Sequence, residues 1–207
     1  VLAGAGKAFC AGHDLKEMRQ RPEQAYYHQL FELCAEMMQT IVRIPQPVIA
    51  RVHGIATAAG CQLVAQCDLA VASTEARFAT SGINVGLFCS TPAVALSRNV
   101  PRKRAFEMLV TGDFIDAKTA ADWSLINAVV APAELDAAVA ALAKKIVDKS
   151  AVAVAAGKRL VYTQLEKGLS GAYAEAAHVM ACNMMAEDVA EGIDAFSAKR
   201  HPVWKHR

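Results

Sequence analysis

Residues 47–67 constrain the fold more than any other stretch, because they predict a buried strand that turns directly into a helix. Residues 47–54 are apolar and rich in β-branched side chains, which indicates the strand, and residues 63–67 indicate the helix. The turn between them is built around Ala58, Ala59 and Gly60. At such a turn the first N–H groups of the helix lack partners, and the helix dipole adds positive potential. The stretch therefore indicates either a place that holds a developing negative oxygen or a tightly packed corner.

The order of the other elements predicts an α/β fold. Further strands are expected at residues 1–6, 68–73 and 126–130, and residues 7–12 are expected to form a loop. A long amphipathic helix is expected to end near residue 44, before Pro45 and Pro47. From residue 150 onward only helices are expected, at 152–165, 169–187 and 191–199. The chain therefore divides into an α/β core over residues 1–149 and a helical C-terminal region over residues 150–207.

Composition narrows the class of protein. Hydrophobic residues make up 54% of the 207 residues and charged residues 20%, which favours a globular protein over a disordered one. The net charge of +2 gives no general attraction to nucleic acid or to a membrane, so neither partner is expected. The six cysteines form no Cys-x-x-Cys pair, which is typical of a reducing compartment. We expect a cytoplasmic protein, with the mitochondrial matrix as the alternative, because a targeting segment would lie upstream of Val1.

Three further motifs are more typical of ordinary structural roles than of a binding or catalytic site. The pair Gly4 and Gly6 lacks the third glycine of a dinucleotide-binding loop, because Phe9 stands at the required position. His178 and Cys182 lie one helical turn apart, but a lone pair of this kind is more typical of packing than of a metal site. The basic run at residues 98–104 indicates a solvated face more than an RNA-binding one. No metal ion is expected.

A second corner of small residues precedes His13. Ala11 and Gly12 lead from the expected loop into a short helix, just as Ala58 and Ala59 lead from a strand into a helix. Two such corners can direct two N–H groups at one oxygen. The sequence alone does not place the two corners side by side.

Several motifs, in order, resemble the enoyl-CoA hydratase/isomerase family, the crotonase superfamily. Residues 6–15, Gly-Lys-Ala-Phe-Cys-Ala-Gly-His-Asp-Leu, resemble its first signature. Residues 47–54, followed by residues 58–63, resemble its second. Blocks that resemble later parts of the family lie at residues 78–86, 109–129 and 191–200. The resemblance covers essentially the whole chain, and the sequence of residues 84–92 resembles that of one subgroup in particular.

The resemblance implies a crotonase-like spiral of ββα turns, with a C-terminal helical region that builds homotrimers or hexamers. It implies an acyl-CoA thioester as the ligand, with coenzyme A as part of the substrate and no permanently bound cofactor. An oxyanion hole would come from the backbone N–H groups of His13 and Ala59, which leaves the His13 imidazole free to point elsewhere. Ligand contacts are expected at Ala11, His13, Asp14, Leu15, Lys16, Ala59, Gly82, Cys89 and Ser90. Compared with the family, the chain lacks the opening strands and the first helix, so we expect either a fragment or an incomplete core.

Two positions depart from the family's hydratases. Where these enzymes carry two glutamates that activate water, this chain has Gln62 and Gly82. A glutamine can orient a water molecule or an acyl group, but it is not a base near neutral pH, so ordinary two-carboxylate hydration is not expected. Restoring both carboxylates, with Gln62→Glu and Gly82→Glu, is expected to raise hydration. The hypotheses are a thioester enzyme that stabilises an enolate, a non-catalytic acyl-CoA binding or regulatory protein, and a decarboxylase that needs no base.

Overall fold

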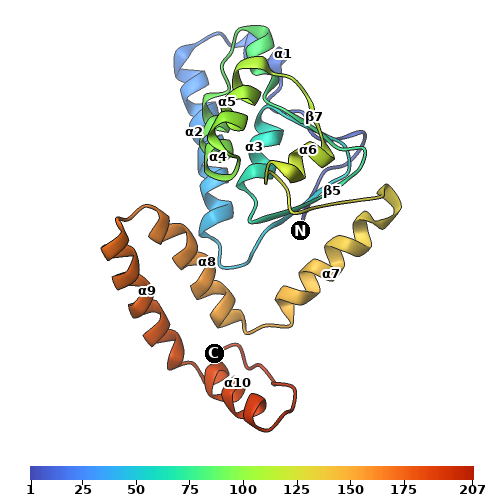
Figure 1. Ribbon diagram of the computed structural model, residues 1–207. Helices are drawn as coiled ribbons and strands as arrows, with labels where there is room; N and C mark the ends of the chain where they lie inside the picture. Colours follow the sequence, from blue (N-terminus) through green and yellow to red (C-terminus); the bar gives the residue numbers. More distant parts are fainter. The chain divides into compact units, whose positions relative to one another are not determined.

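The computed structural model describes residues 1–207 and has eight strands, ten α-helices and two 3-10 helices (Figure 1). The strands are β1 (Leu2–Ala3), β2 (Ala8–Cys10), β3 (Ile49–Val52), β4 (Ile55–Thr57), β5 (Leu69–Ser73), β6 (Arg77–Ala79), β7 (Ile115–Asp116) and β8 (Ala128–Val130). The helices are α1 (Leu15–Gln20), α2 (Gln24–Arg43), α3 (Ala59–Gln66), η1 (Ser81–Val85), α4 (Ser90–Asn99), α5 (Arg102–Thr111), α6 (Ala117–Asp122), η2 (Pro132–Glu134), α7 (Leu135–Val147), α8 (Ala151–Leu165), α9 (Leu169–Met184) and α10 (Glu187–Ser197). None of the helices is both long and apolar enough to cross a membrane.

The strands form two four-stranded sheets, and the first six strands alternate between them. One sheet has the order β1-β3-β5-β8, and the other has the order β2-β4-β6-β7. All neighbours are parallel except β6 and β7. Up to β6 the chain therefore adds one strand to each sheet and then one or more helices before it repeats the pattern. β7 then extends the sheet of β6, and β8 extends the other sheet. The predicted α/β class and the ββα repetition are confirmed.

The chain crosses from one sheet to the other between β3 and β4, at Gly54. A methyl group built on Gly54 would lie 2.7 Å from the carbonyl oxygen of Lys7, so only a glycine lets the two backbones pass this closely. The same holds between β1 and β2, where a methyl group on Gly4 would lie 2.2 Å from the carbonyl oxygen of Phe9. These crossings explain why the apolar run at residues 47–57 forms two short strands and not one.

Two expectations about the local structure are wrong. Residues 8–10 form β2, where a loop was expected, because Ala8 and Cys10 pair with β4 across the sheet. The helix after β4 begins at Ala59, four residues earlier than Leu63, because the strand ends at Thr57 and the chain turns at once. Both differences come from strand pairing, which residue patterns along a short segment do not reveal.

The core that holds these elements lies between the sheets and helices α3, α4 and α5. Phe78, Leu96 and Met108 are among its fully buried side chains. A smaller cluster on α2, made of Cys34, Met38 and Ile41, has Leu63 and Ala59 of α3 packed against it. These contacts fix the start of α3 from both sides.

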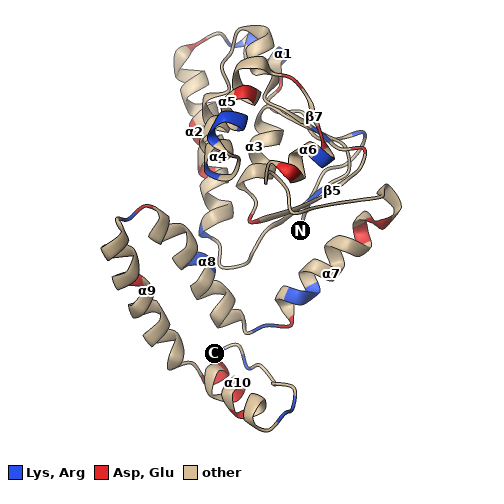
Figure 2. Ribbon diagram, in the orientation of Figure 1, with Lys and Arg blue, Asp and Glu red and all other residues tan.

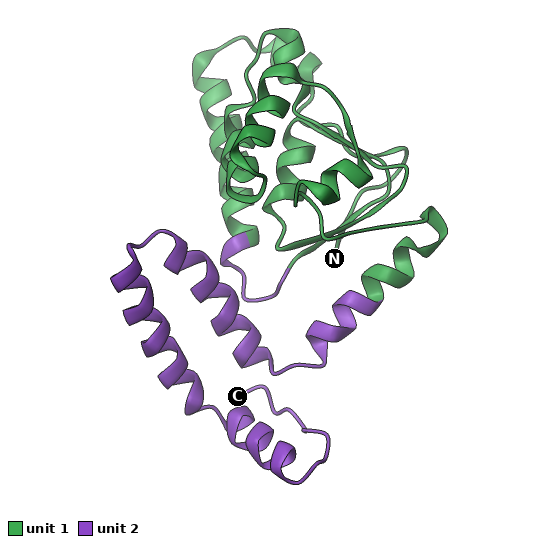
Figure 3. Cartoon of the chain, in the orientation of Figure 1, with its two compact units in different colours: residues 1–41, 48–140 green, residues 42–47, 141–207 purple.

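The chain divides into two compact units (Figure 3). The first consists of Val1–Ile41 and Val48–Ala140, and the second of Val42–Pro47 and Ala141–Arg207. The expected boundary between a core and a helical region, at residues 149 and 150, stays a prediction about domains. Acidic and basic side chains are interspersed in the first unit, whereas α9 carries few charges of either sign (Figure 2).

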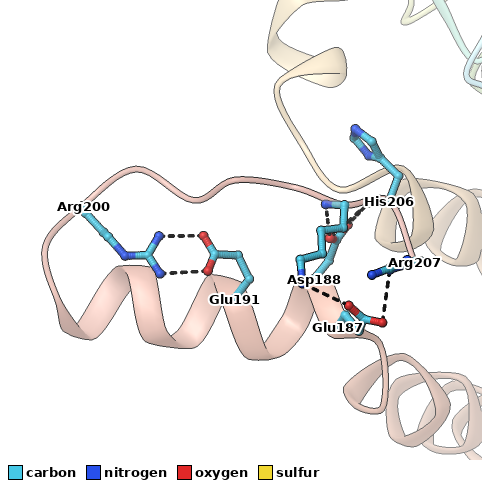
Figure 4. A network of polar contacts seen from close by, with 7 residues as sticks. Glu187, Asp188, Glu191, Arg200, His206 and Arg207 are labelled. Carbon is cyan, nitrogen blue, oxygen red and sulfur yellow. Dashed lines mark hydrogen bonds and ion pairs between the residues drawn. The ribbon is translucent and has the colours of Figure 1, made fainter.

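Within the second unit, carboxylates of α10 hold the C-terminal residues (Figure 4). Glu191 receives two hydrogen bonds from the Arg200 guanidinium, at 2.6 and 2.8 Å, and a third from the N–H of Val203 at 2.7 Å. Asp188 is buried and accepts hydrogen bonds from the N–H groups of Lys205, at 2.7 Å, and His206, at 3.1 Å. The last residues of the chain are thereby tied to the start of α10.

Candidate functional site

The candidate site lies where the parallel strands β2, β4 and β6 end. Carboxyl ends of parallel strands meet at one edge of a sheet, and ligands of α/β proteins bind at such edges. A cavity of about 240 Å³ opens there. Its lining residues are Ala11, His13, Leu15, Met18, Phe31, Ala58, Ala59, Ser81, Gly82, Val85, Leu87, Phe88, Cys89, Ser90, Thr91 and Pro92.

The two small-residue corners are in direct contact at this edge. A methyl group built on Gly12 would lie 3.1 Å from the Cβ of Ala58 and 3.3 Å from the backbone nitrogen of Ala59. A methyl group on Gly60 would lie 2.0 Å from the carbonyl oxygen of Cys10, so only a glycine fits there. The loop that ends at His13 therefore lies on the first turn of α3, and the two corners are neighbours.

The N–H groups of His13 and Ala59 are both free of protein partners. No hydrogen bond from either group to another residue occurs in the structure. The neighbouring groups are engaged, since Ala58 donates to Ala79 at 3.0 Å and Gln62 donates to Ala58 at 3.1 Å. Two unpaired donors thus belong to residues that line one cavity, on segments that are in contact.

Ala58 stores backbone strain at this corner. Its φ of 51° and ψ of −119° lie in a region that residues with side chains seldom occupy. Such a conformation typically costs about 1–3 kcal/mol and persists only where the surroundings enforce it. Here the bond from Ala58 to Ala79 and the contact with Gly12 enforce it. The strained turn is what starts α3 at Ala59, directly after the end of β4.

The His13 side chain also lines the cavity. Its ring meets the Phe31 ring edge to face, with the ring centroids 5.6 Å apart and an angle of 87° between the planes. The side chain is half-buried, and burial lowers the pKa of His13. The imidazole is therefore predominantly neutral near pH 7. His13 and Ala59 also line a second, more open cavity of about 670 Å³ along α2.

Most of the other expected contact residues line the first cavity, but two do not. Ala11, Leu15, Gly82, Cys89 and Ser90 are among the lining residues. Asp14 instead caps α1, accepting hydrogen bonds from the N–H groups of Lys16, at 2.8 Å, and Glu17, at 3.2 Å. Lys16 is exposed and lines neither cavity.

Gln62 lies behind the cavity wall. Its side chain is 3% exposed, its Oε1 atom has no hydrogen-bond partner, and it is not among the lining residues of either cavity. An unpaired buried amide oxygen is uncommon in folded proteins. This position therefore holds a polar atom ready to accept a hydrogen bond, but it does not face the open volume.

Gly82 leaves no room for a side chain. A methyl group there would lie 2.6 Å from the carbonyl oxygen of Leu87 and 2.8 Å from the Sγ atom of Cys89. Leu87 also donates a backbone hydrogen bond to Gly82, at 3.0 Å. A glutamate introduced here would displace this loop, so the contacts oppose the expected gain in hydration from Gly82→Glu.

The cavity walls carry no carboxylate. The polar side chains among them are His13, Ser81, Cys89, Ser90 and Thr91, and the rest are apolar or glycine. Burial raises the pKa of Cys89, so this thiol stays protonated at neutral pH. The chemistry available is therefore two backbone donors, one neutral imidazole and an apolar chamber.

The apolar walls are what the sequence analysis missed. Met18 of α1 and Phe31 of α2 line the cavity together with Val85, at the end of η1, and with Leu87 and Phe88, between η1 and α4. The side chains of Val85, Leu87 and Phe88 are 64%, 43% and 41% exposed, respectively. Consecutive exposed apolar residues in a loop are a signal that the sequence carries, because loops that only connect elements are usually polar.

A family model described as "Enoyl-CoA hydratase/isomerase" matches residues 1–207 of the chain. The chain belongs to the enoyl-CoA hydratase/isomerase family. It is 50% identical to the rat protein named "Enoyl-CoA hydratase domain-containing protein 3, mitochondrial", over 100% of the chain and 69% of the relative. The human protein of the same name is 48% identical, over 100% of the chain and 68% of that protein.

Solved structures of this family share the fold. A Mycobacterium smegmatis enoyl-CoA hydratase superposes with a TM-score of 0.95 and 62% identity, over 97% of this chain and 78% of that one. The human enoyl coenzyme A hydratase domain-containing protein 3 superposes with a TM-score of 0.93 and 49% identity, over 97% and 79% of the two chains. The expected crotonase-like fold, and the subgroup suggested by residues 84–92, are confirmed.

Proposed function

We propose that this chain binds acyl-CoA thioesters and stabilises the thioester enolate with the N–H groups of His13 and Ala59. The supporting observation is the contact of Gly12 with Ala58 and Ala59, which brings two unpaired donors together beside an apolar cavity. When a proton or a carboxylate leaves the α-carbon, negative charge develops on the thioester oxygen. Each fixed donor at such an oxygen typically lowers the barrier by about 2.7–4 kcal/mol.

The apolar chamber is the proposed site of the acyl chain. The cavity, of about 240 Å³, offers this chain a space that is lined mostly by apolar side chains. The apolar walls favour saturated carbon over charged acyl groups.

The absence of a carboxylate from the cavity walls supports enolate chemistry over two-carboxylate addition of water. The reaction class that we propose is therefore a proton transfer or decarboxylation at the α-carbon. The alternative is a non-catalytic acyl-CoA binding protein, which would use the same two donors for recognition alone.

A pair of ligands that differ only in the carbonyl tests the proposal. Butyryl-CoA presents a thioester oxygen to the two donors, whereas the S-butyl-CoA thioether has none. At about 0.5–1.5 kcal/mol for each hydrogen bond, the thioester is expected to bind about 5- to 150-fold more tightly in calorimetry. Equal affinity for the two ligands, or no binding of either, would refute the proposed oxyanion hole.

A variant that lacks one donor adds a second test. Ala59 is the first residue of α3, a position that tolerates proline, so Ala59→Pro removes one N–H group. In this variant the affinity for the thioester is expected to fall close to the affinity for the thioether. Ala59→Gly keeps the N–H group and is the matched control, and circular dichroism verifies that both variants fold.

We also infer the oligomeric state and the cellular compartment from membership of this family. The second unit exposes large apolar side chains on its helices, including Leu165, Tyr173, Met180 and Phe196, which supports burial of these faces in a homotrimer or hexamer. Sedimentation analysis tests this, and a monomer at micromolar concentration would contradict it.

The names of the animal relatives support the mitochondrial matrix, and the cytoplasmic expectation stays a prediction.

A further inference from the structure

We propose that the His13 imidazole removes and returns the proton on the α-carbon of the bound thioester. The inference rests on the proposed function, because it needs a thioester whose oxygen is held by the two N–H groups. It gives His13 a second role, carried by its side chain, beside the role of its backbone.

The His13 side chain differs from the other side chains of the cavity walls in its ability to accept a proton. The walls contain no aspartate, glutamate, lysine, arginine or tyrosine. The hydroxyl groups of Ser81, Ser90 and Thr91 are very weak bases in water, and the Cys89 thiol stays protonated. His13 is thus the one lining residue whose side chain can accept a proton near neutral pH.

The position of the ring suits a proton acceptor. His13 lines the cavity, and its ring packs against Phe31, which lines the cavity too. The N–H group and the imidazole belong to one residue, so a base would lie close to the oxygen-binding group. The α-carbon of a thioester is bonded to the carbonyl carbon, and it therefore lies near any oxygen held at this point. The edge-to-face contact with Phe31 limits the orientations of the ring.

The ring also has a route for the proton. His13 lines the larger, more open cavity along α2 as well as the acyl chamber. A proton taken from the substrate on one side can therefore exchange with solvent on the other. Burial keeps the ring in its neutral, basic form, and no neighbouring charge offsets this effect.

The step balances without a further reactant. A lone pair on an imidazole nitrogen takes the α-proton, and the electrons of the broken C–H bond form the carbon–carbon double bond of the enolate. The negative charge passes to the thioester oxygen, where the N–H groups of His13 and Ala59 hold it. The imidazolium then returns a proton to the same carbon, or to the γ-carbon of an unsaturated chain, which would isomerise it.

Exchange of the α-protons of butyryl-CoA in D₂O, followed by NMR, tests the inference. His13→Gln keeps the backbone N–H group and a side chain of similar length but provides no base. We expect binding within about threefold of the wild type and exchange at least about 100-fold slower, the usual lower range for general base catalysis. His28→Gln, which changes an exposed histidine of α2, is the matched control and is expected to exchange at the wild-type rate.

A second variant separates a chemical role from a structural one. His13→Ala opens space beside Phe31, so added imidazole is expected to restore exchange in this variant and to leave His13→Gln unchanged. Exchange by His13→Gln at more than a third of the wild-type rate would overturn the inference and leave the proposed function standing. Wild-type protein that binds butyryl-CoA without exchange would also overturn it, whereas a failure to bind would refute the proposed function itself.

Discussion

Replacing Ala58 with glycine is expected to make the protein more stable, although glycine usually destabilises. The reason is the backbone conformation, because φ is 51° and ψ is −119° at this residue. A residue with a Cβ atom typically pays about 1–3 kcal/mol in such a region, and glycine adopts it without that cost.

The opposing contributions are smaller. Glycine makes the unfolded chain more flexible, which costs about 0.5–1 kcal/mol. The lost methyl group is only partly buried, so it removes less than the roughly 0.8 kcal/mol of a fully buried group. The net gain is then about 1 kcal/mol, which raises the melting temperature of a chain of this length by about 2–4 °C.

Ala59→Gly is the matched control, because Ala59 is helical and carries no comparable strain. It is expected to lower the melting temperature, since glycine is the poorer helix former by about 1 kcal/mol. Differential scanning calorimetry of both variants and the wild type, at equal protein concentration, measures the difference. If Ala58→Gly melts at or below the temperature of the wild type, the strain argument is refuted.

Three further perturbations have defined outcomes. Gly12→Val is expected to lower the melting temperature and abolish the preference for thioester over thioether, because Gly12 has φ +93° and lies against Ala58 and Ala59; retained preference in calorimetry would contradict the proposed hole. The hydrogen bonds from Arg200 and Val203 lower the pKa of Glu191 from its ordinary value of 4.5 to about 2. The contribution of the Glu191 carboxylate to the stability of the folded state is therefore present above pH 4.5 and is lost as the pH falls toward 2. Melting temperatures of Glu191→Gln should therefore lie below wild type at pH 7 and converge with it at low pH, and a constant gap would be the contrary result. Affinity for saturated acyl-CoA should rise by up to about 0.8 kcal/mol per methylene and level off once the chain fills the cavity, whereas an unbroken rise to the longest chains would show that the chain leaves the cavity.

The sequence predicted the fold class correctly because it depends on local pattern, and the site residues stay a prediction. The apolar run at residues 47–54 and the small residues at both corners were visible in the chain. The contact of the corners depends on the pairing of β2 with β4, and a strand as short as Ala8–Cys10 has too few residues to show a periodic pattern.

Side-chain placement was harder to predict. Gln62 was expected to position a water or acyl group, yet its side chain lies behind the cavity wall, because the helix starts at Ala59 and turns that position inward. The His13 imidazole was left free to point elsewhere, yet His13 lines both cavities and its ring packs against Phe31. The direction of a side chain on a short helix or a bend depends on where the element begins, and boundaries are the least reliable part of sequence interpretation.

The alternation of strands between two sheets has a consequence for how the chain folds. Neighbouring strands are far apart in sequence, since Leu2 pairs with Ala50 and Ala8 pairs with Ile55. Every pair therefore closes a long loop before it gains its contacts, which makes such topologies slow to fold. Because the first six strands alternate between the sheets, the two sheets gain their strands together along most of the chain. The two sheets of the first unit are thus expected to form in a single cooperative transition.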